Sequence, residues 1–160
     1  MIDVVVRAFE PADLPWAESL VADFGGRRHA RLGELVDVLG HPGFVAVPAH
    51  GGGQPIGILT YRPDGDDVEI VFIETTERHQ GAGTRLVEAL VEQVAASRLW
   101  LVTTNDNLDA LRFYQRRGFR IVEIRSGAVD DARRTVKPTL AVVGDHGIER
   151  HDELVLERRP

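Results

Sequence analysis

The sequence predicts an α/β fold with a mixed, mostly antiparallel sheet, one parallel pair of strands and helices on both faces. Successive apolar, β-branched segments separated by turn residues such as Pro63–Asp66 indicate antiparallel strands. A long amphipathic segment connects the apolar strands 67–73 and 99–104, and strands joined through a helix run parallel. The length of 160 residues favours one domain that covers residues 1–160.

The composition narrows the possible function classes. A net charge of −6 disfavours a nucleic-acid partner. The chain has no Cys, which excludes thiolate metal sites, and its six His lack a paired zinc spacing, so no metal is expected. No apolar run approaches the ~20 residues of a membrane span, and residues 1–13 do not resemble a signal peptide. We therefore expect a cytoplasmic protein without a membrane partner.

The N-terminal part predicts one strand followed by two helices. Residues 2–8 are apolar and β-branched, which favours a strand. A helix should begin near Pro11 and end at Gly25, with an apolar face made of Leu14, Ala17, Leu20, Val21 and Phe24. The basic cluster 27–31 is either a solvated loop or helix start, or a contact for phosphate or an acidic acceptor. A second, short helix is predicted from the spacing of Leu32, Leu35, Val36 and Leu39.

The middle of the chain predicts an antiparallel meander that leads into a long helix. Its strands are expected at 44–47, 55–61 and 67–73. A polar link then leads to the segment Arg78-His79-Gln80-Gly81-Ala82-Gly83, and one helix face follows with Leu86, Val87, Leu90, Val91 and Val94. A helix N-terminus leaves backbone N–H groups unpaired, and these groups with the helix dipole bind anions such as a pyrophosphate. Gly81 and Gly83 let the backbone approach such a ligand without a Cβ in the way.

This segment carries a family resemblance. Arg78-x-x-Gly81-x-Gly83 after an apolar strand resembles the acetyl-CoA signature of the GNAT acetyltransferase superfamily. Without a second motif, a helix N-terminus with packing glycines would be the better explanation of this segment. The resemblance implies an acetyl-CoA site made of Phe72, Ile73, Arg78, His79, Gln80, Gly81, Ala82, Gly83 and Thr84.

A second motif follows in the order that the family requires. After the apolar strand 99–104, a helix is expected at 108–117 and a strand at 119–124. The run Asn107-x-x-Ala110-x-x-x-Tyr114-x-x-x-Gly118-Phe119 resembles the GNAT motif at this point. The resemblance implies that Asn107 meets the pantetheine arm and that Tyr114 lies near the CoA sulfur. It covers residues 44–124.

The remainder resembles an uncharacterised bacterial branch of the same superfamily. This resemblance extends through Lys137-Pro138 to residues 152–157, and it supplies no substrate. Segment 126–147 is too long for a simple turn, which suggests a functional or covering loop with a basic patch. Residues 154–156 are expected to form a last strand that pairs with 119–124.

The resemblance also suggests catalytic groups. Tyr114 holds the motif position of the general acid, although a lone Tyr on a helix is usually an aromatic of the core. Glu69 is a carboxylate inside an apolar strand, and strand alternation puts it on one face with Asp67, Val71 and Ile73. Partial burial would make Glu69 a useful base. An exposed or paired Glu69 is the alternative, with Asp67, Glu74 or water as the base.

The expected function is therefore acetyl transfer. The resemblance implies an acetyl-CoA-dependent N-acetyltransferase that moves an acetyl group directly to a primary amine of a small-molecule or peptide acceptor. The alternative is a non-catalytic acyl-CoA-binding sensor or interaction domain. The sequence names no acceptor, and it leaves a homodimer open.

Overall fold

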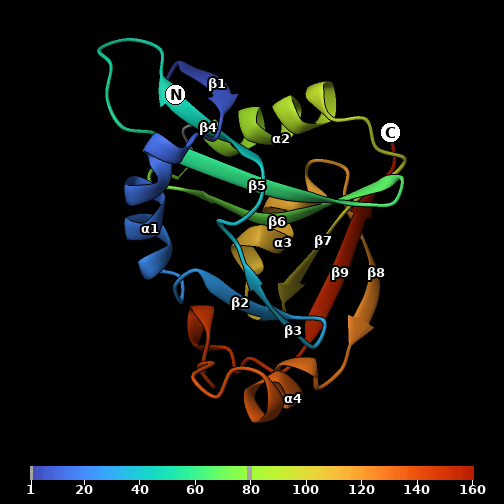
Figure 1. The fold of residues 1–160 in the computed structure, drawn as a ribbon. Helices are drawn as coiled ribbons and strands as arrows, with labels where there is room; N and C mark the ends of the chain where they lie inside the picture. The colour runs from blue at the N-terminus through green and yellow to red at the C-terminus, as the bar shows by residue number, and fades with distance from the viewer. Residues whose placement is uncertain (1, 79–80) are drawn as a thin grey trace. The chain divides into compact units, whose positions relative to one another are not determined.

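The computed structural model describes residues 2–78 and 81–160, and these form two compact units. The first unit contains the chain up to Arg28 together with Asp37–Ser97. The second unit contains His29–Val36 and Arg98–Pro160. Figure 1 labels the α-helices and strands of both units. In the described parts of the chain, no helix combines the length and apolar character that crossing a membrane requires.

The first unit is built on four antiparallel strands. Strands β1 (Val4–Ala8), β4 (Gly43–Pro48), β5 (Gly57–Asp64) and β6 (Asp67–Thr75) are neighbours in that order. This confirms the predicted meander, although β5 begins two residues later than expected and continues to Asp64. The β5–β6 turn is only Gly65 and Asp66, and Gly65 has a φ of +62°, the left-handed region that such turns require.

Helices cover both faces of this sheet. The short helix η1 (Pro11–Asp13) leads into α1 (Leu14–Ala22), which begins and ends close to the predicted limits. Ala17 and Val21 of α1 belong to one core cluster with Ile58 of β5. The adjacent Gly57 faces the other side, where a Cβ would lie 3.1 Å from Cδ1 of Leu86 on α2 (Ala82–Gln93). Alternate strand residues therefore face α1 and α2, as predicted.

The second unit is built on three antiparallel strands. Strand β9 (Glu153–Arg158) pairs with both β7 (Leu99–Thr104) and β8 (Arg120–Arg125). This confirms the predicted pairing of the last strand with the strand after Gly118. Helix α3 (Leu108–Gln115) connects β7 to β8 in the chain. Helix α2 connects β6 to β7, which is the connection that a parallel pair requires.

The predicted second helix is wrong, because its residues form a hairpin. Strands β2 (Arg28–Arg31) and β3 (Glu34–Asp37) are joined by a two-residue turn. Leu32 and Gly33 have φ values of 50° and 78°, and two successive left-handed residues define a hairpin turn and end any helix. The basic cluster is therefore mostly strand rather than a loop or helix start, and Arg31 is buried with Nη1 3.0 Å from Oε1 of Glu34.

The strict alternation expected along β6 is also wrong. Thr60 pairs with Phe72 and Tyr61 pairs with Ile70, so β6 carries one extra residue, Val71. Such a bulge breaks the two-residue period. The consecutive residues Val68, Glu69 and Ile70 are all buried, with exposed fractions of 3%, 0% and 3%.

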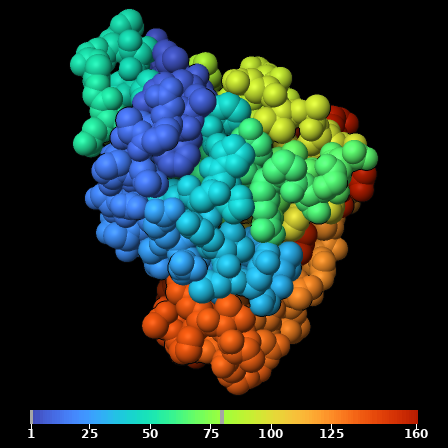
Figure 2. Space-filling model, viewed as in Figure 1, coloured from blue at the N-terminus to red at the C-terminus, as the bar shows by residue number. Residues whose placement is uncertain are grey.

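The segment expected to be a long loop contains regular structure. Helix α4 (Ala128–Thr135) begins after the left-handed Gly127, and the short helix η2 (Asp145–Gly147) follows. Asp130 and Asp131 lie in the first turn of α4, and Arg133 and Arg134 lie in the last, an order that the helix dipole favours. Elsewhere the β4–β5 connection is an exposed loop, and residues 50–54 project from the first unit (Figure 2).

The hairpin turn predicts a stabilising substitution. The left-handed conformation costs a non-glycine L-residue about 1 kcal/mol, but asparagine tolerates it. Leu32→Asn should therefore raise the free energy of unfolding by about 0.5–1 kcal/mol, as measured by urea denaturation. Leu35→Asn is the matched control, because Leu35 lies in β3 and is 41% exposed. Equal effects of both substitutions would contradict the strain argument.

Candidate active site

The acetyl-CoA signature lies where β6 leads into α2. Gly81 is the N-cap of α2 with a φ of +86°, a conformation that favours glycine, and it supplies no side chain to cap the helix. Ala82, Gly83 and Thr84 form the first turn, as expected. Arg78 is exposed on the preceding turn. The predicted contacts of His79 and Gln80 lie outside the described residues.

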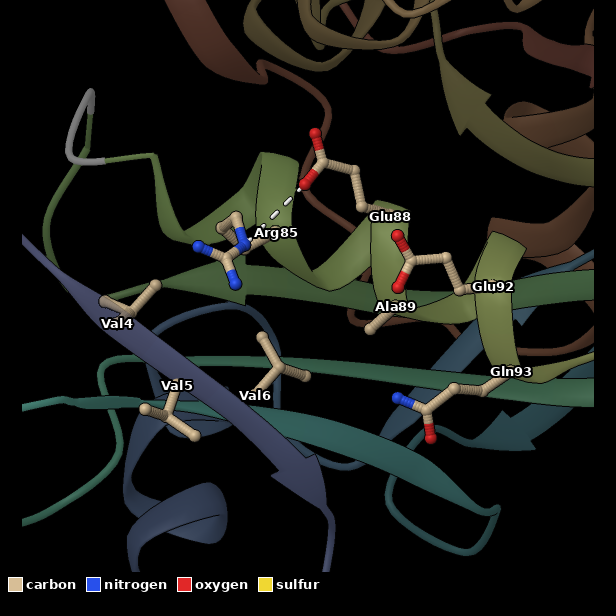
Figure 3. Close-up of a pocket in the computed structure, with 8 residues that line it drawn as sticks. All are labelled: Val4, Val5, Val6, Arg85, Glu88, Ala89, Glu92 and Gln93. Atoms are coloured by element: carbon tan, nitrogen blue, oxygen red, sulfur yellow. Dashed lines mark ion pairs between the residues drawn. The ribbon is translucent and has the colours of Figure 1, made fainter.

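Two grooves border α2 on its β1 side. One, of about 410 Å³, lies between Val4–Val6 and the exposed side of α2 (Figure 3). Arg85 and Glu88 on its rim form an ion pair of 3.6 Å. The other, of about 450 Å³, reaches Gly81 and Thr84 at the start of the helix. Of the predicted site residues, these two are the only ones among the described residues that line either groove.

The proposed base lies inside β6. Glu69 has no exposed surface, and its Oε2 is 2.8 Å from Nε of Arg62, its direct partner on β5. The sequence left open whether Glu69 is a partly buried base or is exposed or paired. In the structure, Glu69 is paired with Arg62. Phe72 is 8% exposed and follows the bulged Val71. The first unit thus places Glu69, Phe72 and Ile73 on one strand and Gly81–Thr84 at the start of the helix after it.

The second motif is held on α3 of the second unit. The Asn107 side chain caps this helix, because its Oδ1 accepts a hydrogen bond from the N–H of Ala110 at 3.2 Å. Its Nδ2 donates to Oγ1 of Thr103, also at 3.2 Å. Tyr114 is 4% exposed and packs edge-on against Phe113 and Phe119, with ring centroids 5.2 Å apart in each pair. Its ring is therefore part of the core, whatever its hydroxyl does.

A buried carboxylate next to Asn107 was not predicted from the sequence. Asp106 has no exposed surface, and it accepts hydrogen bonds from Oγ1 of Thr104 at 2.6 Å and from the N–H of Asp145 at 2.9 Å. Arg150 donates to it twice, from Nε at 3.1 Å and from Nη2 at 2.9 Å. The available signal was the uninterrupted polar run Thr104–Asn107 directly after an apolar strand.

These contacts set the charge state of Asp106. Burial alone would raise its pKa, but the hydrogen bonds from Arg150, Thr104 and the Asp145 N–H, with the charge of Arg150, lower the pKa to about 2. Asp106 is therefore an anion at neutral pH and serves as an acceptor of hydrogen bonds. Across residues 2–78 and 81–160, no cluster of three or more His, Cys, Asp or Glu side chains could hold a metal ion.

The low pKa of Asp106 predicts an acid-sensitive contribution to stability. A carboxylate whose pKa falls from 3.8 to about 2 on folding stabilises the protein above pH 3.8, and this contribution disappears as pH falls to about 2. The loss should be about 2 kcal/mol, measured by urea denaturation between pH 5 and 2. Asp106→Asn should flatten this part of the pH profile, whereas Asp131→Asn, at an exposed carboxylate of α4, should not. Identical profiles for both variants would refute the assignment.

Comparison with sequence families and curated proteins identifies relatives of this chain. The model of the acetyltransferase (GNAT) family matches residues 10–119. The uncharacterised protein YdhI of Bacillus subtilis is 37% identical over 119 residues, which are 72% of this chain and 72% of YdhI. This agrees with the predicted resemblance to an uncharacterised bacterial branch.

Solved structures share the fold. An IAA acetyltransferase from Bacillus cereus is 22% identical with a TM-score of 0.67, over 99% of this chain and 100% of its own. A GNAT family acetyltransferase from Elizabethkingia anophelis, solved with acetyl-CoA bound, is 20% identical with a TM-score of 0.67, over 98% of both chains. The predicted α/β fold class, with a mostly antiparallel sheet, is therefore confirmed. By the match of the family model to most of its length, this chain belongs to the GNAT acetyltransferase family.

Proposed function

We propose that this protein is an acetyl-CoA-dependent N-acetyltransferase of the cytoplasm, formed by residues 1–160 as one domain. It transfers an acetyl group directly to a primary amine of a small-molecule or peptide acceptor. The observation that carries the proposal is the start of α2 at the left-handed Gly81, in the connection that follows β6 and inside the segment that resembles the acetyl-CoA signature of the family.

The start of α2 suits a pyrophosphate. The first N–H groups of a helix have no partner within the helix, and the positive end of the dipole attracts anions. A capping side chain usually accepts hydrogen bonds from these groups, but Gly81 has none. In the proposed complex the phosphate oxygens accept these hydrogen bonds, with Arg78, His79, Gln80 and Ala82–Thr84 around them.

Strand β6 suits the pantetheine arm. The bulge at Val71 bends β6 and changes the direction of the residues next to it. The proposal assigns the backbone of Phe72 and Ile73 to the arm, with an N–H there polarising the thioester carbonyl. Asn107 would bind the same arm with its side-chain amide.

Acetyl-CoA supplies the acetyl group as a thioester. Glu69 is assigned the proton that the amine loses as the new N–C bond forms. Tyr114 is assigned the proton that the sulfur gains as the C–S bond breaks, so protons balance over the reaction. Glu69 is paired with Arg62. The alternative bases are therefore Asp67, Glu74 and water.

The first prediction of this proposal concerns acetyl-CoA binding. Acetyl-CoA should raise the melting temperature of the protein, since a ligand of the native state stabilises it. Gly81→Asp should abolish this increase, because a carboxylate would meet the pyrophosphate. Gly65→Asp is the matched control: Gly65 is also left-handed, with a φ of +62°, but lies in the β5–β6 turn. Equal acetyl-CoA responses in the two variants would exclude the phosphate site.

The second prediction separates catalysis from binding alone. Tyr114→Phe should slow single-turnover acetyl transfer by on the order of 10²-fold, the lower range for a positioned acid, because a thiolate with a pKa of about 8.5 leaves fairly well unaided. Tyr61→Phe, at the other Tyr of the chain, should transfer at the wild-type rate. The measurement is free-thiol release with a panel of amines. Thermal stabilisation by acetyl-CoA without thiol release from any amine would favour the non-catalytic sensor.

A further inference from the structure

Two of the residues that bind the Asp106 carboxylate, Asp145 and Arg150, come from beyond the part of the chain that the family model matches. That match ends at residue 119. We call Gly144–Asp152 the clamp segment. We infer that Arg150 is a positioning residue: through Asp106 it fixes Asn107 and the first turn of α3 for acetyl-CoA binding. This inference rests on the role that the proposed function gives to Asn107.

Arg150 and Asp106 form a partly buried, two-bond ion pair. Their side chains are 24% and 0% exposed, and both Nε and Nη2 of Arg150 donate to the carboxylate. A guanidinium that binds both oxygens fixes orientation as well as distance. The two residues are 44 positions apart in the sequence, so the pair joins the clamp segment to the end of β7.

Asn105 joins the same two segments next to this ion pair. Its Oδ1 accepts hydrogen bonds from the N–H groups of His151 and Asp152, at 2.9 and 3.0 Å. Its Nδ2 donates to the carbonyl of Glu149 at 2.8 Å. Two successive side chains of the 104–107 loop are thus bound along the clamp segment, which limits the freedom of the residue that follows them.

The backbone of the clamp segment lies close to the Asp106 side chain at Gly144. A Cβ on Gly144 would overlap Oδ2 and Cγ of Asp106, so only glycine fits there. His146 adds a weaker contact to the first turn of α3, with Nε2 3.6 Å from Oδ2 of Asp109. The clamp segment therefore lies against the residues on both sides of Asn107.

The ion pair acts on Asn107 through the short connection between them. The N–H of Leu108 donates to the carbonyl of Asp106 at 2.8 Å, and the N–H of Asn107 donates to the carbonyl of Thr104 at 3.1 Å. A shift of Asp106 would therefore move the Asn107 amide and its bond to the N–H of Ala110. Tyr114 lies at the far end of α3 and is held by aromatic packing instead. Loss of the ion pair should therefore affect acetyl-CoA binding more than turnover.

The test compares Arg150→Met with a matched control, Arg133→Met. Arg133 fastens the C-terminal region through the carbonyls of Leu140, Ala141 and Arg150, but it makes no bond to residues 104–107. Arg150→Met should raise the KM for acetyl-CoA by roughly tenfold or more with a smaller change in kcat, because small misplacements of a binding group are costly. Arg150→Lys, which keeps the charge and loses the fork, should give an intermediate KM. Arg133→Met should leave the KM for acetyl-CoA close to wild type.

A second measurement is independent of activity. Hydrogen exchange at the Ala110 N–H reports the Asn107 cap, and it should accelerate in Arg150→Met more than in Arg133→Met. Equal KM values and equal exchange in the two variants would overturn the inference. If Arg150→Met does not fold, Arg150→Lys decides by the same two readings. If the wild-type protein neither binds acetyl-CoA nor releases thiol, the proposed function fails, whereas the exchange comparison still decides whether Arg150 holds Asn107.

Discussion

Buried carboxylates must be paired, and this constraint fixes the junctions in both units. A charge without exposed surface and without partners would cost several kcal/mol. The described residues include four buried carboxylates, each bound to a residue of another segment: Asp13 with Arg7, Glu69 with Arg62, Asp106 with Arg150, and Glu153 with the N–H of Leu32. The contacts of Asp106 and Glu153 join segments that are 44 and 121 positions apart in the sequence. Glu153 differs from Asp106 because burial raises its pKa.

The two helix starts of the proposed site differ in what they offer a ligand. Helix α2 begins at Gly81, which supplies no side chain, so its first N–H groups suit an anion. Helix α3 begins at Asn107, whose side chain already caps the helix and also binds Thr103. A ligand at α2 therefore meets backbone, whereas a ligand at α3 meets an amide whose direction other bonds have fixed. In the proposed complex, the residues that hold Asn107 therefore set the direction of the amide that meets the ligand.

The burial of the Tyr114 ring is compatible with the proposed role of its hydroxyl as a general acid. Its ring packs against Phe113 and Phe119, which fixes the direction of the hydroxyl. A positioned acid gains from such rigidity, since only the hydroxyl must reach the reacting atoms. Glu69 is more constrained, because the same pair with Arg62 that stabilises its burial occupies one of its oxygens.

The sequence by itself determined the features that depend on neighbours in the chain. The strands of the meander, helix α2 after Gly81 and helix α3 after Asn107 follow from local periodicity and glycine placement. Only the tertiary structure decided the 28–37 hairpin, the bulge at Val71 and the partners of Asp106. Leu32 adopts a left-handed conformation that leucine rarely takes. A bulge depends on the register of the partner strand. Arg150 and Asp106 are 44 positions apart in the sequence. Such features depend on contacts that form only after the chain has folded, and a local pattern cannot encode them.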